Sequence, residues 1–141
     1  MKIKSQKSKI KDKSSYEGLQ ENVRDMKTPE IEVWENQYPD KLYTVRLEIP
    51  EFTCICPKTG LPDFATINIE YSPDKYCIEL KSFKMYMIFY RGVGIFHEHL
   101  INRILGDFVK ACKPRRAKIN GEFNPRGGIK TIVSAEYITE K

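Results

Sequence analysis

The segment FHEHLINRILGDFVKAC at residues 96–112 decides the fold class, because it is the clearest helix in the chain. Its apolar residues recur at helical spacing and form a single stripe: Phe96, Leu100, Ile101, Ile104, Leu105, Phe108 and Cys112. Gly92 and Gly94 precede the segment, and Pro114 ends it because proline cannot continue a helix. The pattern predicts an amphipathic helix with one buried face.

Segments on both sides of this helix have the pattern of strands. Residues 42–49 alternate apolar and polar side chains, which predicts a half-buried strand that ends at Pro50. Residues 64–71 and 76–80 flank SPDK, and proline at the second place of a four-residue turn predicts a hairpin there. Residues 117–123 and 129–138 are predicted strands around NPRGG, a hairpin loop whose glycines permit positive φ.

Residues 79–90 are ambiguous, because residues 85–90 are continuously apolar and fit either a buried strand or a buried helix. Lys81 and Lys84 favour the helix, since residues three apart share a helical face. The predicted order is strand, strand, helix, helix, strand, strand, with a short extra strand at Tyr76. This order is typical of an α+β fold with an antiparallel sheet.

Length and charge predict one domain with a basic leader. The chain has 141 residues and a net charge of +5, and residues 1–13 contain six lysines and one aspartate. The remaining residues are neutral overall, so the charge is weak evidence for a nucleic-acid surface. We expect residues 1–30 to form a basic, disordered leader and residues 31–141 to form a single domain.

Composition also predicts a soluble, cytoplasmic protein without a bound metal. No apolar run approaches the ~20 residues of a membrane-spanning helix, and the leader lacks the apolar core of a signal peptide. Four cysteines in a chain without such a signal are expected to be thiols. Cys54 and Cys56 are spaced CxC, and on a helix His97 and His99 would point about 200° apart, so we expect no metal site.

The stretch EFTCICPKTGLPDF at residues 51–64 contains the candidate reactive groups. Cys56 stands seven residues before Asp63, across a loop expected from Pro57, Gly60 and Pro62. A thiolate beside an acid suits a nucleophile with a proton donor, and Lys58 could lower the pKa of the thiol. On this stretch alone the commoner interpretation is structural, with Cys56 a small buried side chain and Asp63 a turn residue.

Four segments together carry a family resemblance. EFTCICPKTGLPDF, ELKSFKMY at 79–86, GIFHEH at 94–99 and NPRGG at 124–128 occur in the order found in QueF. QueF proteins are NADPH-dependent 7-cyano-7-deazaguanine reductases of queuosine biosynthesis, a tRNA modification. The resemblance covers roughly residues 40–138. It implies the tunnelling fold, a strand-strand-helix-helix-strand-strand unit, which agrees with the order predicted above.

By this resemblance Cys56 adds to the nitrile carbon of 7-cyano-7-deazaguanine and forms a covalent thioimide, while Asp63 protonates the nitrile nitrogen. Two NADPH then reduce the thioimide to an amine. The chemistry fits, because a nitrile is a weak electrophile that needs both a thiolate and a proton donor. Cys54 departs from the family pattern by adding a second thiol. Met85 and His99 also depart from that pattern.

The resemblance also implies binding residues for the deazaguanine base and for NADPH. Base-binding residues are implied at Ile78, Glu79, Leu80, His97 and Glu98, and phosphate contacts at Lys81, Lys84 and Arg126. A carboxylate suits a guanine-like edge because it accepts two adjacent N–H donors. Each of these residues also has a structural interpretation when taken alone. Glu98 would be an acid favoured by the helix dipole, His97 a packed side chain, and the cations part of a solvated basic face.

One module of this length resembles the short form of the family, whose members assemble as face-to-face pentamers with sites between subunits. We therefore expect a homo-oligomer, a decamer of two pentamers by analogy, with neither membrane nor nucleic acid as a direct partner. Three alternatives remain: an archaeosine-type amidinotransferase that forms the same thioimide, a zinc-dependent pterin-type enzyme of the same fold, and a non-enzymatic RNA-binding module. Deleting residues 1–30 is expected to spare catalysis but not tail-driven RNA binding.

Overall fold

The computed structural model describes residue 20 and residues 23–139. Most of the predicted leader, residues 1–19 and 21–22, lies outside the described residues. The elements follow in the order η1 (Val23–Asp25), β1 (Val33–Glu35), β2 (Val45–Ile55), β3 (Pro62–Ser72), β4 (Tyr76–Ile78), α3 (Leu80–Phe89), η2 (Tyr90–Gly92), α4 (His97–Cys112), β5 (Arg116–Arg126) and β6 (Ile129–Ile138). The predicted α+β class and its order of elements are confirmed, whereas the short strand β1 was not predicted.

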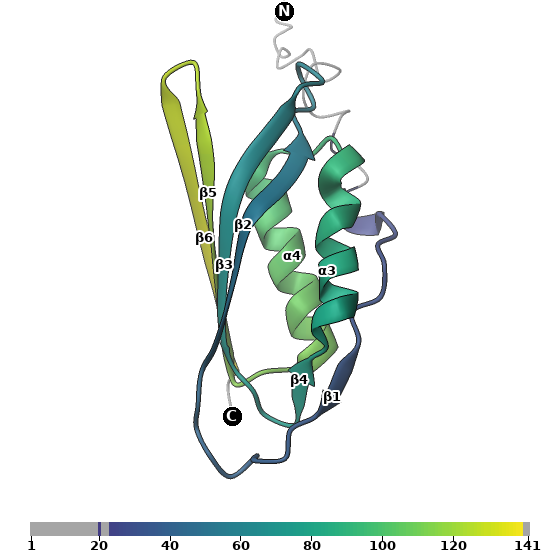
Figure 1. Ribbon diagram of the computed structural model, residues 1–141, viewed down its shortest axis with the longest axis vertical. Helices are drawn as coiled ribbons and strands as arrows, with labels where there is room; N and C mark the ends of the chain where they lie inside the picture. The colour runs from purple at the N-terminus through teal and green to yellow at the C-terminus, as the bar shows by residue number, and fades with distance from the viewer. Residues whose placement is uncertain (1–19, 21–22, 140–141) are drawn as a thin grey trace, which may run out of the picture.

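One antiparallel sheet carries the architecture, with strand order β2-β3-β5-β6. Helices α3 and α4 lie side by side on one face of this sheet, and the small β1-β4 sheet lies at one end of the helices (Figure 1). Strands β2 and β6 are the two edges of the large sheet. The helical layer and the sheet therefore enclose a single core. Among the described residues no further strand pairs with the outer edge of β6, and the outer edge of β2 is paired only at Ile55, which bridges to Gly94.

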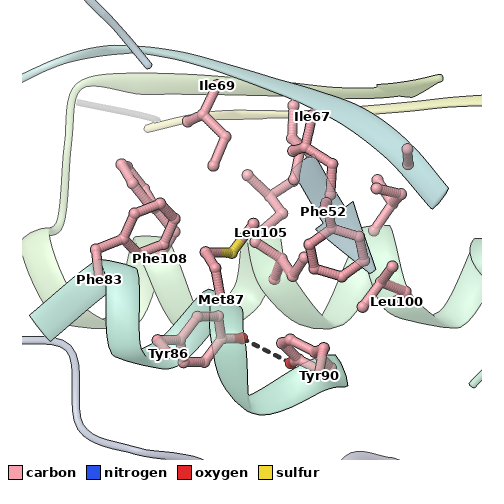
Figure 2. Close-up of a cluster of buried hydrophobic side chains, with 14 of the residues drawn as sticks. Phe52, Ile67, Ile69, Phe83, Tyr86, Met87, Tyr90, Leu100, Leu105 and Phe108 are labelled. Atoms are coloured by element: carbon pink, nitrogen blue, oxygen red, sulfur yellow. Dashed lines mark hydrogen bonds between the residues drawn. The ribbon is translucent and has the colours of Figure 1, made fainter. Parts of the chain in front are cut away.

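The core lies between the helices and the inner face of the sheet (Figure 2). Alternate residues of β3 face inward, so Ala65, Ile67 and Ile69 are buried. The predicted stripe of α4 is buried from Leu100 to Cys112, and α3 contributes Phe83, Tyr86 and Met87. Full burial of one such large apolar side chain stabilises the fold by about 1.5–3 kcal/mol.

The ends of the two helices follow from their local sequence. Residues 79–90 form a helix, α3, in agreement with the weak preference from Lys81 and Lys84. Helix α4 ends at Cys112, and Lys113 adopts a left-handed conformation with φ of 48° before Pro114. A left-handed residue followed by proline is a common way to end a helix, so the predicted stop is confirmed.

The predicted hairpin between residues 64–71 and 76–80 is wrong. Strand β4 pairs with β1 and not with β3, with Trp34 opposite Cys77. Both edges of β3 are already occupied by β2 and β5, so β3 has no edge left for β4. The turn at residues 72–75 therefore carries the chain away from the large sheet, and the Tyr71 hydroxyl accepts a hydrogen bond from the Ile78 N–H at 3.0 Å.

Two predicted loops are shorter than expected. Strand β2 does not end at Pro50 but continues to Ile55, with an irregular register between Ile49 and Phe52. Proline is tolerated there because β2 is an edge strand, where a missing N–H need not break a ladder. The predicted loop at residues 51–64 thus shrinks to residues 56–61, and the NPRGG loop shrinks to Gly127 and Gly128, whose φ values are 60° and 83°.

No helix among residue 20 and residues 23–139 is both long and apolar enough to cross a membrane.

The close approach of β5 to α4 predicts a sharp difference between two glycines. A Cβ added at Gly121 would lie 2.6 Å from the Ile101 Cδ1 atom, whereas a Cβ at Gly106 meets nothing within 4 Å. We expect Gly121→Ala to lower the free energy of unfolding by about 1–3 kcal/mol through overpacking, and Gly106→Ala to be neutral or stabilising. Urea denaturation checks this; equal stability of the two variants would contradict it.

Candidate active site around Cys56

The turn between β2 and β3 places Cys56 at one end of the sheet. The Cys56 N–H donates to the Leu61 carbonyl at 2.8 Å, and the Gly60 N–H donates to the Cys56 carbonyl at 2.8 Å. Gly60 has a φ of 75°, which explains the glycine at this position. The Thr59 hydroxyl accepts from the Leu61 N–H at 3.2 Å. These bonds close a compact turn with the half-buried Cys56 at its start.

The same turn distinguishes Cys56 chemically from Cys54. The Thr59 hydroxyl hydrogen-bonds the thiolate and lowers the pKa of Cys56, helped by the backbone N–H groups of Thr59 and Lys58. Burial raises the pKa of Cys54 to about 12, with the charges of Asp63 and Cys56 adding to the effect. Because only the thiolate is a good nucleophile, these pKa shifts favour Cys56 over Cys54 as the reactive sulfur.

Thr59 was not predicted from the sequence. It lies in the segment PKTG. The signal that could have found it is that threonine hydroxyls in turns often form hydrogen bonds to nearby groups.

Asp63 is a buried carboxylate held by two partners. It lies on β3, only 6% exposed, and contacts Arg126 from β5 and His97 from α4. The Arg126 Nη1 group donates hydrogen bonds to Asp63 Oδ1 and to the Pro62 carbonyl, the latter at 2.8 Å. The His97 Nε2 atom lies 3.1 Å from Asp63 Oδ2. The carboxyl group is therefore fixed on both oxygens, as burial of such a group requires.

His97 and Glu98 form the first two residues of α4 and border the same cavity. The His97 ring stacks on Phe123, with ring centroids 3.6 Å apart and planes 6° apart. The Glu98 side chain is exposed at the amino end of the helix. Together with Cys56, Asp63 and Arg126 they line a cavity of about 240 Å³. Five of the predicted site residues thus meet at one end of the molecule.

The other predicted base-binding residues lie elsewhere in the chain. Ile78 is buried at the end of β4, and Leu80 is 58% exposed at the start of α3. Glu79 caps α3, since its carboxylate accepts hydrogen bonds from the N–H groups of Ser82 at 2.7 Å and Lys81 at 3.0 Å. Figure 1 shows β4 and the start of α3 at the opposite end of the molecule from the β2–β3 turn. Within one chain the two groups are not brought together.

A second cavity lies between the edge strand β2 and helix α3. It has a volume of about 440 Å³ and apolar walls that include Phe52 and Met87. Three cations, Arg46, Lys84 and Arg91, line it together with two carboxylates, Glu48 and Glu51, whereas Lys81 does not. Arg46 and Arg91 were not predicted, because no motif distinguishes them from ordinary surface arginines. Arginine and lysine both pair with phosphate, so this groove suits an anionic ligand with an apolar part.

His97 and His99 make separate contacts. His97 contacts Asp63, whereas the Nδ1 atom of His99 lies 2.9 Å from the Gln20 side-chain oxygen. Among the residues that the structure describes, no three His, Cys, Asp or Glu side chains are grouped so as to hold a metal ion.

Comparison with known proteins identifies the family. The sequence model of the QueF-like protein family matches residues 62–141. The chain belongs to the QueF family. Two curated relatives are 56% identical over 111 residues (Elusimicrobium minutum; 79% of this chain, 83% of the relative) and 59% identical over 107 residues (Halorhodospira halophila; 76% and 91%). Both carry the name NADPH-dependent 7-cyano-7-deazaguanine reductase.

The fold has a match among solved structures of the QueF family as well. The crystal structure of the archaeosine synthase QueF-Like in the apo form aligns with a TM-score of 0.62 at 28% identity. The alignment covers 66% of this chain and 91% of that one. The predicted tunnelling fold and the predicted family are therefore confirmed.

The contrast between the cysteines predicts selective alkylation. We expect iodoacetamide at neutral pH to modify Cys56 well before Cys54 or Cys112, because burial raises the pKa of each of the latter two to about 12. Since the pKa of Cys56 is lowered, its labelling should persist to lower pH than that of an ordinary cysteine. Peptide mass mapping of briefly treated native protein measures this. Labelling of Cys54 at the same rate as Cys56 would contradict it.

Proposed function

We propose that the chain reduces the nitrile of 7-cyano-7-deazaguanine to an aminomethyl group with NADPH, in the biosynthesis of queuosine for tRNA. The observation that carries this proposal is the single cavity in which Cys56, with its lowered pKa, and the buried Asp63 both lie. The names of the relatives from Elusimicrobium and Halorhodospira support the same substrate and cofactor.

The first chemical step is addition of Cys56 to the nitrile. The thiolate sulfur forms a bond to the nitrile carbon, and one π bond of the triple bond breaks toward nitrogen. Asp63 takes up the proton that the Cys56 thiol loses and passes it to that nitrogen, which leaves a thioimide on Cys56 and a carboxylate on Asp63. The step balances, because the proton that reaches the nitrogen is the one that the thiol loses.

Arg126 and His97 serve the carboxylate that this step produces. Arg126 faces one oxygen of Asp63 and His97 Nε2 lies 3.1 Å from the other, so both oxygens have a donor. Donors held in place before the reaction stabilise charge that develops in it. We therefore assign Arg126 to Asp63, although the family resemblance implies a contact to NADPH.

Glu98 and His97 suit the deazaguanine base. The Glu98 carboxylate is exposed at the cavity and accepts two adjacent N–H donors, as a guanine-like edge offers. His97 is held by its stacking on Phe123, so its ring orientation is fixed before substrate binds. A site that pairs with the N–H groups of the base rejects analogues that lack them.

NADPH fits the groove between β2 and α3. Lys84, Arg46 and Arg91 would hold its phosphates, and the apolar wall around Phe52 and Met87 suits its rings. Conversion of the thioimide to an aminomethyl group requires two hydride equivalents, which NADPH supplies when bound. Lys81, which does not line the groove, remains a candidate for a phosphate contact across a subunit boundary.

A homo-oligomer would complete the site. Ile78, Glu79 and Leu80 lie at the far end of the chain from Cys56, so a second copy would have to bring them to the cavity. Both edge strands, β2 and β6, are available for pairing, and edges of this kind invite a further strand. Ile132 and Ile138 on β6 are more than half exposed. A decamer of two pentamers, in the cytoplasm, is the assembly we propose by analogy.

Covalent capture tests the proposed reaction. We expect the purified protein, incubated with 7-cyano-7-deazaguanine alone, to gain one substrate mass per chain through the Cys56 thioimide. Cys56→Ala should lose the adduct and Cys54→Ala should retain it, because only Cys56 lies in the cavity with a lowered pKa. Intact mass spectrometry measures both.

Addition of NADPH or ammonia to the captured protein separates two activities. Release of an aminomethyl product with NADPH supports the reductase, whereas release of an amidine with ammonia supports an amidinotransferase, the activity suggested by the archaeosine synthase match. An intact Cys56 that never reacts would refute the proposal.

The role of Arg126 is tested without NADPH. We expect Arg126→Gln to slow adduct formation by about tenfold or more, because Asp63 loses the donor on one oxygen. Lys84→Met should leave adduct formation unchanged and raise the KM for NADPH. Stopped-flow or quenched mass measurements give the adduct rate. If Arg126→Gln altered only the KM for NADPH, Arg126 would be a cofactor residue instead.

A further inference from the structure

The side chain of Gln20, which belongs to the predicted leader, contacts the turn before α4. Gln20 is 9% exposed, and its Oε1 atom accepts the Phe96 N–H at 3.1 Å. Its Nε2 atom donates to the Gly94 carbonyl at 3.4 Å. These two backbone partners, one a donor and one an acceptor, fix which way the amide points. Gln20 thus bonds to a turn 74–76 residues later in the chain.

The contact replaces a missing cap at the start of α4. Phe96 is the N-cap residue and gives no side-chain cap. In a capping box, a Glu or Gln three residues later accepts the N–H of the N-cap residue. That position is His99 here, and its Nδ1 atom lies 2.9 Å from the same Gln20 oxygen. Gln20 therefore supplies the acceptor for the N-cap N–H, which is one of the two hydrogen bonds of a capping box, although it is distant in the sequence.

The turn that Gln20 contacts is also hydrogen-bonded to the end of β2, the strand that leads into Cys56. The Ile55 N–H donates to the Val93 carbonyl at 2.9 Å, and the Ile95 N–H donates to the Ile55 carbonyl at 3.0 Å. Ile55 directly precedes Cys56. The turn at residues 93–96 thus lies between the strand that carries Cys56 and the side chain of Gln20, and it leads directly into His97 and Glu98.

Arg103 anchors the segment that follows Gln20. Its guanidinium donates to the carbonyls of Val23 and Met26, the latter at 2.7 Å, while its Nε donates to Asp107 at 2.8 Å. Asp107 also accepts a hydrogen bond from the Tyr86 hydroxyl. An arginine on α4 therefore holds residues 23–26 against the same helix whose first turn Gln20 caps.

We propose that Gln20 is a positioning residue that holds the first turn of α4, so that His97 and Glu98 meet the substrate base in the correct orientation. The inference rests on the proposed function, because it requires that His97 and Glu98 bind that base. It also changes the expectation for a deletion of residues 1–30, which would remove both Gln20 and the carbonyls that Arg103 binds. Such a deletion should weaken substrate binding.

Three full-length variants test the role. Gln20→Leu keeps about the same volume and removes the hydrogen bonds to Gly94, Phe96 and His99. Gln20→Glu keeps an acceptor for Phe96 and His99, and Gln37→Leu changes an exposed glutamine as a matched control. Substrate affinity is measured by calorimetry in the Cys56→Ala background, where no covalent bond forms. The KM values for substrate and NADPH are measured with Cys56 intact, and melting temperatures report folding.

We expect Gln20→Leu to weaken substrate binding by about five- to tenfold, as loss of buried hydrogen bonds predicts, with the KM for NADPH unchanged. Gln20→Glu should recover most of the affinity, and Gln37→Leu should match the parent protein. Unchanged substrate affinity in Gln20→Leu, or a lower melting temperature with unchanged affinity of the folded protein, would overturn the positioning role. A parent protein that neither binds nor captures the substrate would instead refute the proposed function.

Discussion

Three segments that are far apart in the sequence meet at the carboxylate of Asp63, and the candidate site depends on that meeting. Strand β3 brings the carboxylate, β5 brings Arg126 and α4 brings His97. A buried carboxylate without partners is strongly unfavourable, so the three elements are held in one arrangement by the polar groups that they share. The lowered pKa of Cys56, by contrast, comes mainly from its own turn, where Thr59 and the backbone N–H groups of Thr59 and Lys58 stabilise the thiolate.

The candidate site residues lie in two separate places in the chain. Asp63 lies on β3, His97 begins α4 and Cys56 begins the turn after β2, and all three line one cavity within a single chain. The β4–α3 junction with Glu79 lies at the other end of the helical layer, and β2 and β6 form the two edges of the sheet.

Much of this arrangement could be predicted. The period of residues 96–112 predicted α4, because an amphipathic stripe has few alternative solutions. The sequence offered Cys56 and Asp63 as a nucleophile and a proton donor across a proline-glycine loop, and the family resemblance assigned them those roles. In the structure both residues line one cavity. Pairing choices could not be predicted. The proline turn after β3 looked like a hairpin, and only the occupation of both β3 edges by β2 and β5 shows why β4 pairs elsewhere.

The sequence by itself determined the α+β class, the family, and the residues that carry the proposed chemistry, because local periodicity and short motifs are written in consecutive residues. Only the tertiary structure decided which cysteine has a stabilised thiolate, which acid Arg126 faces, and that Gln20 reaches the first turn of α4. Burial and hydrogen bonding depend on what folds against each group. Partners separated by 63 and 76 residues leave no local pattern in the chain.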